Sequence, residues 1–156
     1  MIPAPGSFGV VRSHSRVALA IRVATMSRRN HAVIAADSST LIEANPTGVE
    51  RKPLDEYPPE SIVWSKPPTD WQGVQVVRFA ESCLGDDYNY PGIAALAADH
   101  FLHWRPQWLD DVANKPTTWF CSQLVVAAYR HAGIDLNPGP DWICSPGDLA
   151  EYILTH

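Results

Sequence analysis

Short apolar runs, each a few residues long, dominate the first third of the chain. Asp37, Ser38 and Ser39 separate two β-branched-rich runs, which is the composition of a hairpin turn, and Asn45-Pro46 marks a second turn. The runs lie at residues 6–13, 31–37, 39–45 and 48–54. The pattern predicts an antiparallel sheet near the N-terminus.

Apolar residues with a helical spacing dominate most of the remaining chain. Gly133 can end one helix in a left-handed conformation, and Ser145-Pro146 can begin the last helix as N-cap and first residue. The predicted helices cover residues 17–26, 71–85, 93–104, 121–133 and part of 140–154. Residues 54–71 are rich in proline, which favours an irregular loop with one short strand at 61–65. We therefore expect an α+β fold with a single domain over residues 1–156.

Composition and charge narrow the classes of partner. The 46% hydrophobic and 19% charged residues are typical of a globular protein with its own core. A formal net charge of -5 disfavours binding to nucleic acid or anionic lipid, which require a basic surface. The sequence shows no signal-peptide layout and no apolar stretch near the roughly 20 residues that span a bilayer. It predicts a protein made in the cytoplasm without stable membrane insertion, although phage-type or co-secreted proteins can leave a cell without a signal.

The three cysteines, Cys83, Cys121 and Cys144, are too few and too widely spaced for a disulfide framework or a CxxC zinc site. Cys121 begins the predicted helix 121–133, where first-turn N–H groups and the helix dipole stabilise a thiolate. This placement is typical of a nucleophile. A buried core cysteine is the other interpretation, because cysteine is among the most buried residue types.

A nucleophilic cysteine needs a base, and the base needs an acceptor that orients it. His31 opens one predicted strand, and Glu43 lies inside the apolar run LIEA of the next. If these strands pair, the two side chains can share a face and hydrogen-bond. Taken singly, each would be an ordinary polar strand residue.

The order of these segments resembles the circularly permuted branch of the NlpC-type papain-fold cysteine peptidases, the YiiX- and YaeF-like proteins. The resemblance spans nearly the whole chain, and the histidine strand precedes the cysteine helix, as in that branch. It rests on GxFGVVRS, NHAVIA, LIEANPTGV, LGDDYNYPG, FCSQLVVAAYRHAGI and SPGDLA, in this order. It implies a permuted papain-like fold, with an antiparallel sheet packed against helices.

By this resemblance Cys121 matches the nucleophile, His31 the base and Glu43 the third member. Tyr88, in LGDDYNYPG, would donate its hydroxyl to the oxyanion or contact the substrate, with Tyr90 packed against the core. The chain departs from the family in two places. Gln123 replaces the more usual Glu, and Ala32 and Ala35 replace the usual Val and Gly after the histidine.

The leading hypothesis is a hydrolase that cleaves amide bonds through a thioester. It requires no cofactor or metal, and the resemblance implies a peptide substrate, most often a peptidoglycan peptide. A lipid-directed acyltransferase or esterase is an alternative, although the NCEHF motif of the lecithin retinol acyltransferase group is replaced here by WFCSQ. A non-enzymatic binding module with a vestigial triad is the third.

Two further features each have a functional and a purely structural interpretation. The stretch 93–118, rich in Trp and Pro, either shapes specificity or is an ordinary helical insertion, and Asp99, His100 and His103 on it fit a polar helix face better than a metal site. Arg28 and Arg29 would bind a substrate carboxylate or form a solvated turn.

Overall fold

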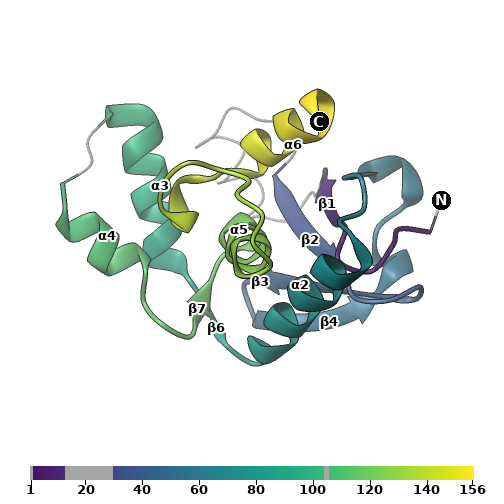
Figure 1. Ribbon diagram of the computed structural model, residues 1–156. Coiled ribbons are helices and arrows are strands. Elements are labelled where there is room, and N and C mark those ends of the chain that lie inside the picture. Colours follow the sequence, from purple (N-terminus) through teal and green to yellow (C-terminus); the bar gives the residue numbers. More distant parts are fainter. Residues whose placement is uncertain (1, 13–29, 104–105) are drawn as a thin grey trace.

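The computed structural model describes residues 2–12, 30–103 and 106–156. Its main feature is a five-stranded sheet in the order β4-β3-β2-β1-β5, with every neighbouring pair antiparallel (Figure 1). The strands are β1 (Phe8–Val11), β2 (His31–Ala35), β3 (Thr40–Asn45), β4 (Gly48–Pro53) and β5 (Ile62–Trp64). All five predicted strands are confirmed. The helix predicted at 17–26 lies outside the described residues, as do Arg28 and Arg29.

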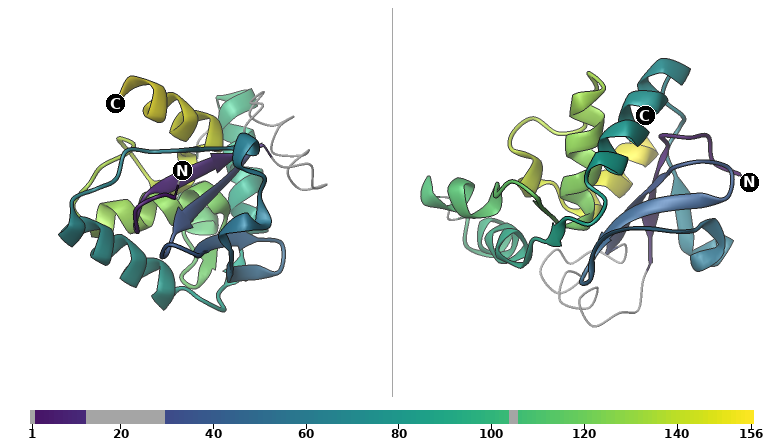
Figure 2. Two further views of the ribbon diagram at one scale, coloured as in Figure 1. Left: turned by 90° about the vertical axis from the view of Figure 1, so that its right-hand side faces the viewer. Right: turned by 90° about the horizontal axis from the view of Figure 1, so that it is seen from below.

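The helices gather on one side of the sheet (Figure 2). Helix α5 packs against β2, β3 and α2, while α6 reaches β1 and α3 packs against α4. Their bounds are α2 (Asp70–Ser82), α3 (Tyr90–Leu102), α4 (Trp108–Ala113), α5 (Cys121–His131) and α6 (Pro146–Thr155), with short 3-10 turns η1 (Leu54–Glu56), η2 (Pro59–Ser61) and η3 (Asp141–Ile143). The α+β class is therefore confirmed, and α4 is a helix that the periodicity did not predict. No helix among the described residues has the length and apolarity needed to cross a membrane.

The alternation of side chains along the strands creates two cores of unequal size. The face toward the helices buries Phe8, Val10, Ala32, Ile34, Ile42 and Ala44. The opposite face buries Val11, Val33 and Leu41, and the segment from η1 to β5 packs over them. Because side chains alternate with a period of two, His31 and Glu43 belong to the same set as Val33 and Leu41.

The insertion between α2 and α5 is closed at its base by a second, two-stranded sheet. Strands β6 (Asp87–Tyr88) and β7 (Thr118–Trp119) pair in parallel, and the Trp119 indole donates to Asp86 at 2.8 Å. The segment that contains α3 and α4 therefore begins and ends at this two-stranded sheet. Phe120 joins β7 directly to Cys121, so the sheet positions the start of α5.

Local sequence signals explain where the helices begin and end. Thr69 and Ser145 cap α2 and α6 through reciprocal bonds with the third helical residue, as capping boxes do. Gly133 follows α5 with a φ of 78°, the left-handed conformation in which glycine carries no steric penalty.

Candidate active site

The pairing of β2 with β3 brings His31 and Glu43 together. Its register places Ile34 opposite Ile42 and Ala35 opposite Leu41. Continued toward the start of β2, this register makes Glu43 a diagonal neighbour of His31 on one face. The His31 Nε2 lies 2.8 Å from the Glu43 Oε2, and both residues are buried, with exposed fractions of 9% and 3%. The sequence-predicted contact is therefore present.

The Glu43 carboxylate has two further donors. The Tyr57 hydroxyl donates to Oε2 at 2.7 Å, and the Asn45 side-chain amide donates to Oε1 at 3.1 Å. Burial by itself raises the pKa of Glu43, but the bonds from His31, Tyr57 and Asn45 outweigh it and lower the pKa to about 2. Glu43 is thus a buried carboxylate that stays charged at neutral pH.

Cys121 completes the group from the first turn of α5, where it is 1% exposed. Burial lowers the pKa of His31, whereas the hydrogen bond and charge of Cys121, followed by those of Glu43, raise it, with a net value of about 10. Since Nε2 faces Glu43, Nδ1 is the ring nitrogen left for Cys121. The imidazole is therefore protonated at neutral pH between a carboxylate and the sulfur.

Gln123 fixes the start of α5. Its Oε1 accepts from the Asn89 side chain at 2.9 Å and from the Phe120 backbone N–H at 3.4 Å, and its Nε2 donates to the Ala113 carbonyl at 3.1 Å. A glutamate could accept the first two bonds but could not donate the third. Glutamine at this position therefore ties α5 to α3 and α4 without burying a charge.

Tyr88 lies in the same buried cluster as Cys121. Burial, followed by the charge of Cys121, raises the pKa of Tyr88 above its ordinary value, so its hydroxyl remains a neutral donor. Its ring meets that of Tyr90 edge to face at 5.0 Å. The expectation for Tyr90 is wrong. Tyr90 is 54% exposed, because the first residue of α3 faces outward there.

The other two cysteines have different surroundings. Cys83, Cys121 and Cys144 are all free and buried. Burial raises the pKa of the Cys83 thiol to about 11 and that of Cys144 further still. No histidine contributes to the raised pKa of either thiol. Both are therefore expected to be unreactive thiols, useful as internal references for Cys121.

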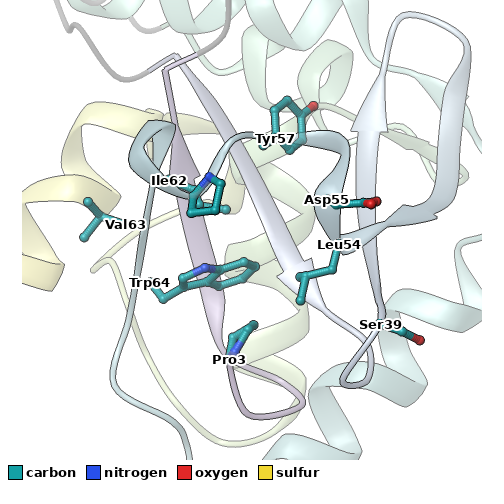
Figure 3. A pocket seen from close by; sticks show the side chains of 9 residues that line it. Pro3, Ser39, Leu54, Asp55, Tyr57, Ile62, Val63 and Trp64 are labelled. Atoms are coloured by element: carbon teal, nitrogen blue, oxygen red, sulfur yellow. The ribbon is translucent and has the colours of Figure 1, made fainter. Parts of the chain in front are cut away.

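Tyr57 also lines a cavity of about 630 Å³ on the sheet face away from α5 (Figure 3). The polar residues of its wall include Asp55 and Ser39. The rest of the wall is mostly apolar and is formed by Pro3, Leu54, Pro59, Ile62, Val63 and Trp64. A smaller cavity of about 380 Å³ includes Tyr88, Tyr90 and Lys115 in its wall. The larger cavity thus adjoins Tyr57, which bonds to Glu43, and the smaller one adjoins Tyr88, which lies in the same buried cluster as Cys121.

Sequence reasoning missed Tyr57, Asn45 and the bonds of Gln123. Asn45 carried a usable signal, since it stands two residues after Glu43 on the same strand and so on the same face. Tyr57 carried none, because it lies in the proline-rich segment between strands, where no period predicts a direction.

The described residues contain no group of three or more His, Cys, Asp or Glu side chains that could hold a metal ion. His103 ends α3 in a left-handed conformation, with a φ of 45°.

A comparison with protein-family models gave no match, and neither did a comparison with curated proteins.

Proposed function

We propose that the chain is a cysteine hydrolase with a circularly permuted NlpC-type papain-like fold. The observation that carries the proposal is a buried relay in which Cys121, at the start of α5, interacts with His31, and His31 bonds to Glu43 at 2.8 Å. This is the nucleophile, base and orienting group that thiol catalysis needs.

In the proposed reaction the Cys121 thiolate attacks the carbonyl carbon of an amide and forms a C–S bond. The tetrahedral intermediate collapses as the C–N bond breaks, and His31 gives its Nδ1 proton to the leaving amine. His31 then takes a proton from water, and the resulting hydroxide releases the acid from the thioester. The departing thiolate and the reprotonated imidazole restore the starting pair.

Glu43 would stabilise the imidazolium and hold its ring. The backbone N–H of Cys121, in the first helical turn where N–H groups lack intrahelical partners, would bind the oxyanion together with the Tyr88 hydroxyl. Tyr88 suits this role because it is buried next to Cys121 and remains protonated.

For the substrate we propose a peptide, with peptidoglycan peptides first, as the family resemblance implies. A second candidate is the ester or amide of a lipid. The observation that favours it is the apolar cavity beside Tyr57, whose volume of about 630 Å³ is enough for part of an acyl chain (Figure 3). Parallel assays with cell-wall peptides and with long-chain acyl esters separate the two.

The test of the proposed chemistry is alkylation of the native protein by limiting iodoacetamide between pH 4 and 9, with the modified site mapped by mass spectrometry. Wild type should react first at Cys121 and remain reactive at pH 5 to 6, where free thiols are slow. His31→Ala should lose this selectivity, while His100→Ala, an exposed histidine on α3, should keep it. Equal reactivity of Cys121, Cys83 and Cys144 would favour the binding-module alternative.

A further inference from the structure

A residue from outside the expected triad reaches the same carboxylate oxygen as His31. The Tyr57 hydroxyl lies 2.7 Å from Glu43 Oε2, and the His31 Nε2 lies 2.8 Å from that atom. Two donors that converge on one oxygen fix its position in two directions. We propose that Tyr57 is a positioning residue, which holds the Glu43 carboxylate in place for His31. This inference rests on the proposed function.

Packing fixes the direction of the Tyr57 hydroxyl. The ring lies over the small core of Val11, Val33 and Leu41, and its centroid is 5.8 Å from that of the His31 ring. Its other side faces the cavity seen in Figure 3. A ring held between a core and an imidazole loses little further freedom when its hydroxyl bonds, so the donor is preorganised.

The protonation state of Tyr57 also suits this role. Burial, followed by the charge of Glu43, raises the pKa of Tyr57, so the phenol is a neutral donor at neutral pH, where Glu43 is charged. With Asn45 on Oε1 at 3.1 Å, both oxygens of the carboxylate are held. Removing Tyr57 from this set should leave Glu43 less able to stabilise the imidazolium.

A hydroxyl that merely satisfies a buried acceptor would stabilise the fold without changing the titration of His31. The discriminating experiment follows the His31 Hε1–Cε1 signal by NMR from pH 5 to 11 in the full chain. Tyr57→Phe keeps the ring and removes the hydroxyl. It should lower the midpoint of His31 by less than about one pH unit, because the lost hydrogen bond is made to Glu43 and only part of its free energy reaches His31. Tyr152→Phe, on α6, is the matched control and should leave the midpoint unchanged.

A double variant tests whether Tyr57 acts through Glu43. Glu43→Gln should lower the midpoint further than Tyr57→Phe, and adding Tyr57→Phe to it should change little. An unchanged midpoint in Tyr57→Phe, or a full additional shift in the double variant, would overturn the proposal. An ordinary midpoint near 6.5 in wild type would instead refute the proposed function, so the two failures are distinguishable.

Should Tyr57→Phe fail to fold, wild type still provides a test. The Tyr57 hydroxyl proton should exchange slowly enough to give a resolved signal at low temperature, with a nuclear Overhauser effect to the His31 ring. A rapidly exchanging hydroxyl without that effect would overturn the proposal.

Discussion

His31 and Glu43 stand twelve positions apart in the chain, yet Nε2 of one lies 2.8 Å from Oε2 of the other. The β2–β3 hairpin produces this contact, since antiparallel pairing returns the chain beside itself and the period of two puts both side chains on one face. The residues proposed as the base and its orienting group thus belong to one hairpin. Cys121 lies on α5, a segment distant from this hairpin in the sequence.

Glu43→Gln should weaken the stabilisation of the protonated His31 ring while it keeps nearly the same side-chain volume. The amide lacks the negative charge that stabilises the imidazolium, so we expect alkylation of Cys121 at pH 6 to slow by about tenfold, equivalent to about 1.4 kcal/mol. Glu60→Gln, in the exposed η2 turn, is the matched control. A rate equal to that of wild type would show that Glu43 has no electrostatic role.

Stability should depend on pH in opposite senses at the two ends of the range. The pKa of His31 is raised from 6.5 to about 10, so its contribution is complete below pH 6.5 and is lost as the pH rises through 10. The pKa of Glu43 is lowered from 4.5 to about 2, so its contribution is complete above pH 4.5 and is lost as the pH falls through 2.

Urea unfolding at a series of pH values measures both contributions. The alkaline decline should be smaller in His31→Ala, and the acid decline should be smaller in Glu43→Gln, than in wild type. Identical pH dependence in all three proteins would contradict the assigned shifts.

Gln123→Glu should destabilise the fold. The carboxylate cannot donate to the Ala113 carbonyl, which then keeps only its bond from the Asn89 side-chain amide at 2.6 Å, and it places a buried charge beside that carbonyl oxygen. We expect a loss of about 1–3 kcal/mol in the free energy of unfolding, measured by urea denaturation at pH 7. Gln75→Glu, half-buried on α2, should cost less. Equal stabilities would mean that the contact with Ala113 contributes nothing.

Gly133→Ala isolates a backbone effect at the end of α5. A Cβ at this position would meet no atom within 4 Å, so the cost comes only from the φ of 78° and should be about 1 kcal/mol. Gly133→Asn should cost less, because asparagine tolerates the left-handed region. Thermal unfolding measures both, and alkylation of Cys121 should not change. An alanine variant as stable as wild type would contradict the argument.

The sequence by itself determined the local elements and their limits. The polar triplet 37–39 separated β2 from β3, Gly133 and Ser145 marked helix ends, and alternation predicted that Glu43 could face His31. These features depend on neighbours within a few residues, where period, caps and turn residues carry the information. The hydrogen bond between His31 and Glu43 is present, and its role in catalysis stays a prediction.

Tertiary structure decided what joins those elements. The parallel pair β6–β7, the outward side chain of Tyr90 and the three bonds of Gln123 depend on segments that meet only after folding. Tyr57 is the clearest case, because its loop has no regular period and its direction is set by packing over Val33 and Leu41. Periodicity specifies which face of an element is buried, but long-range packing decides which side chains from other elements meet there.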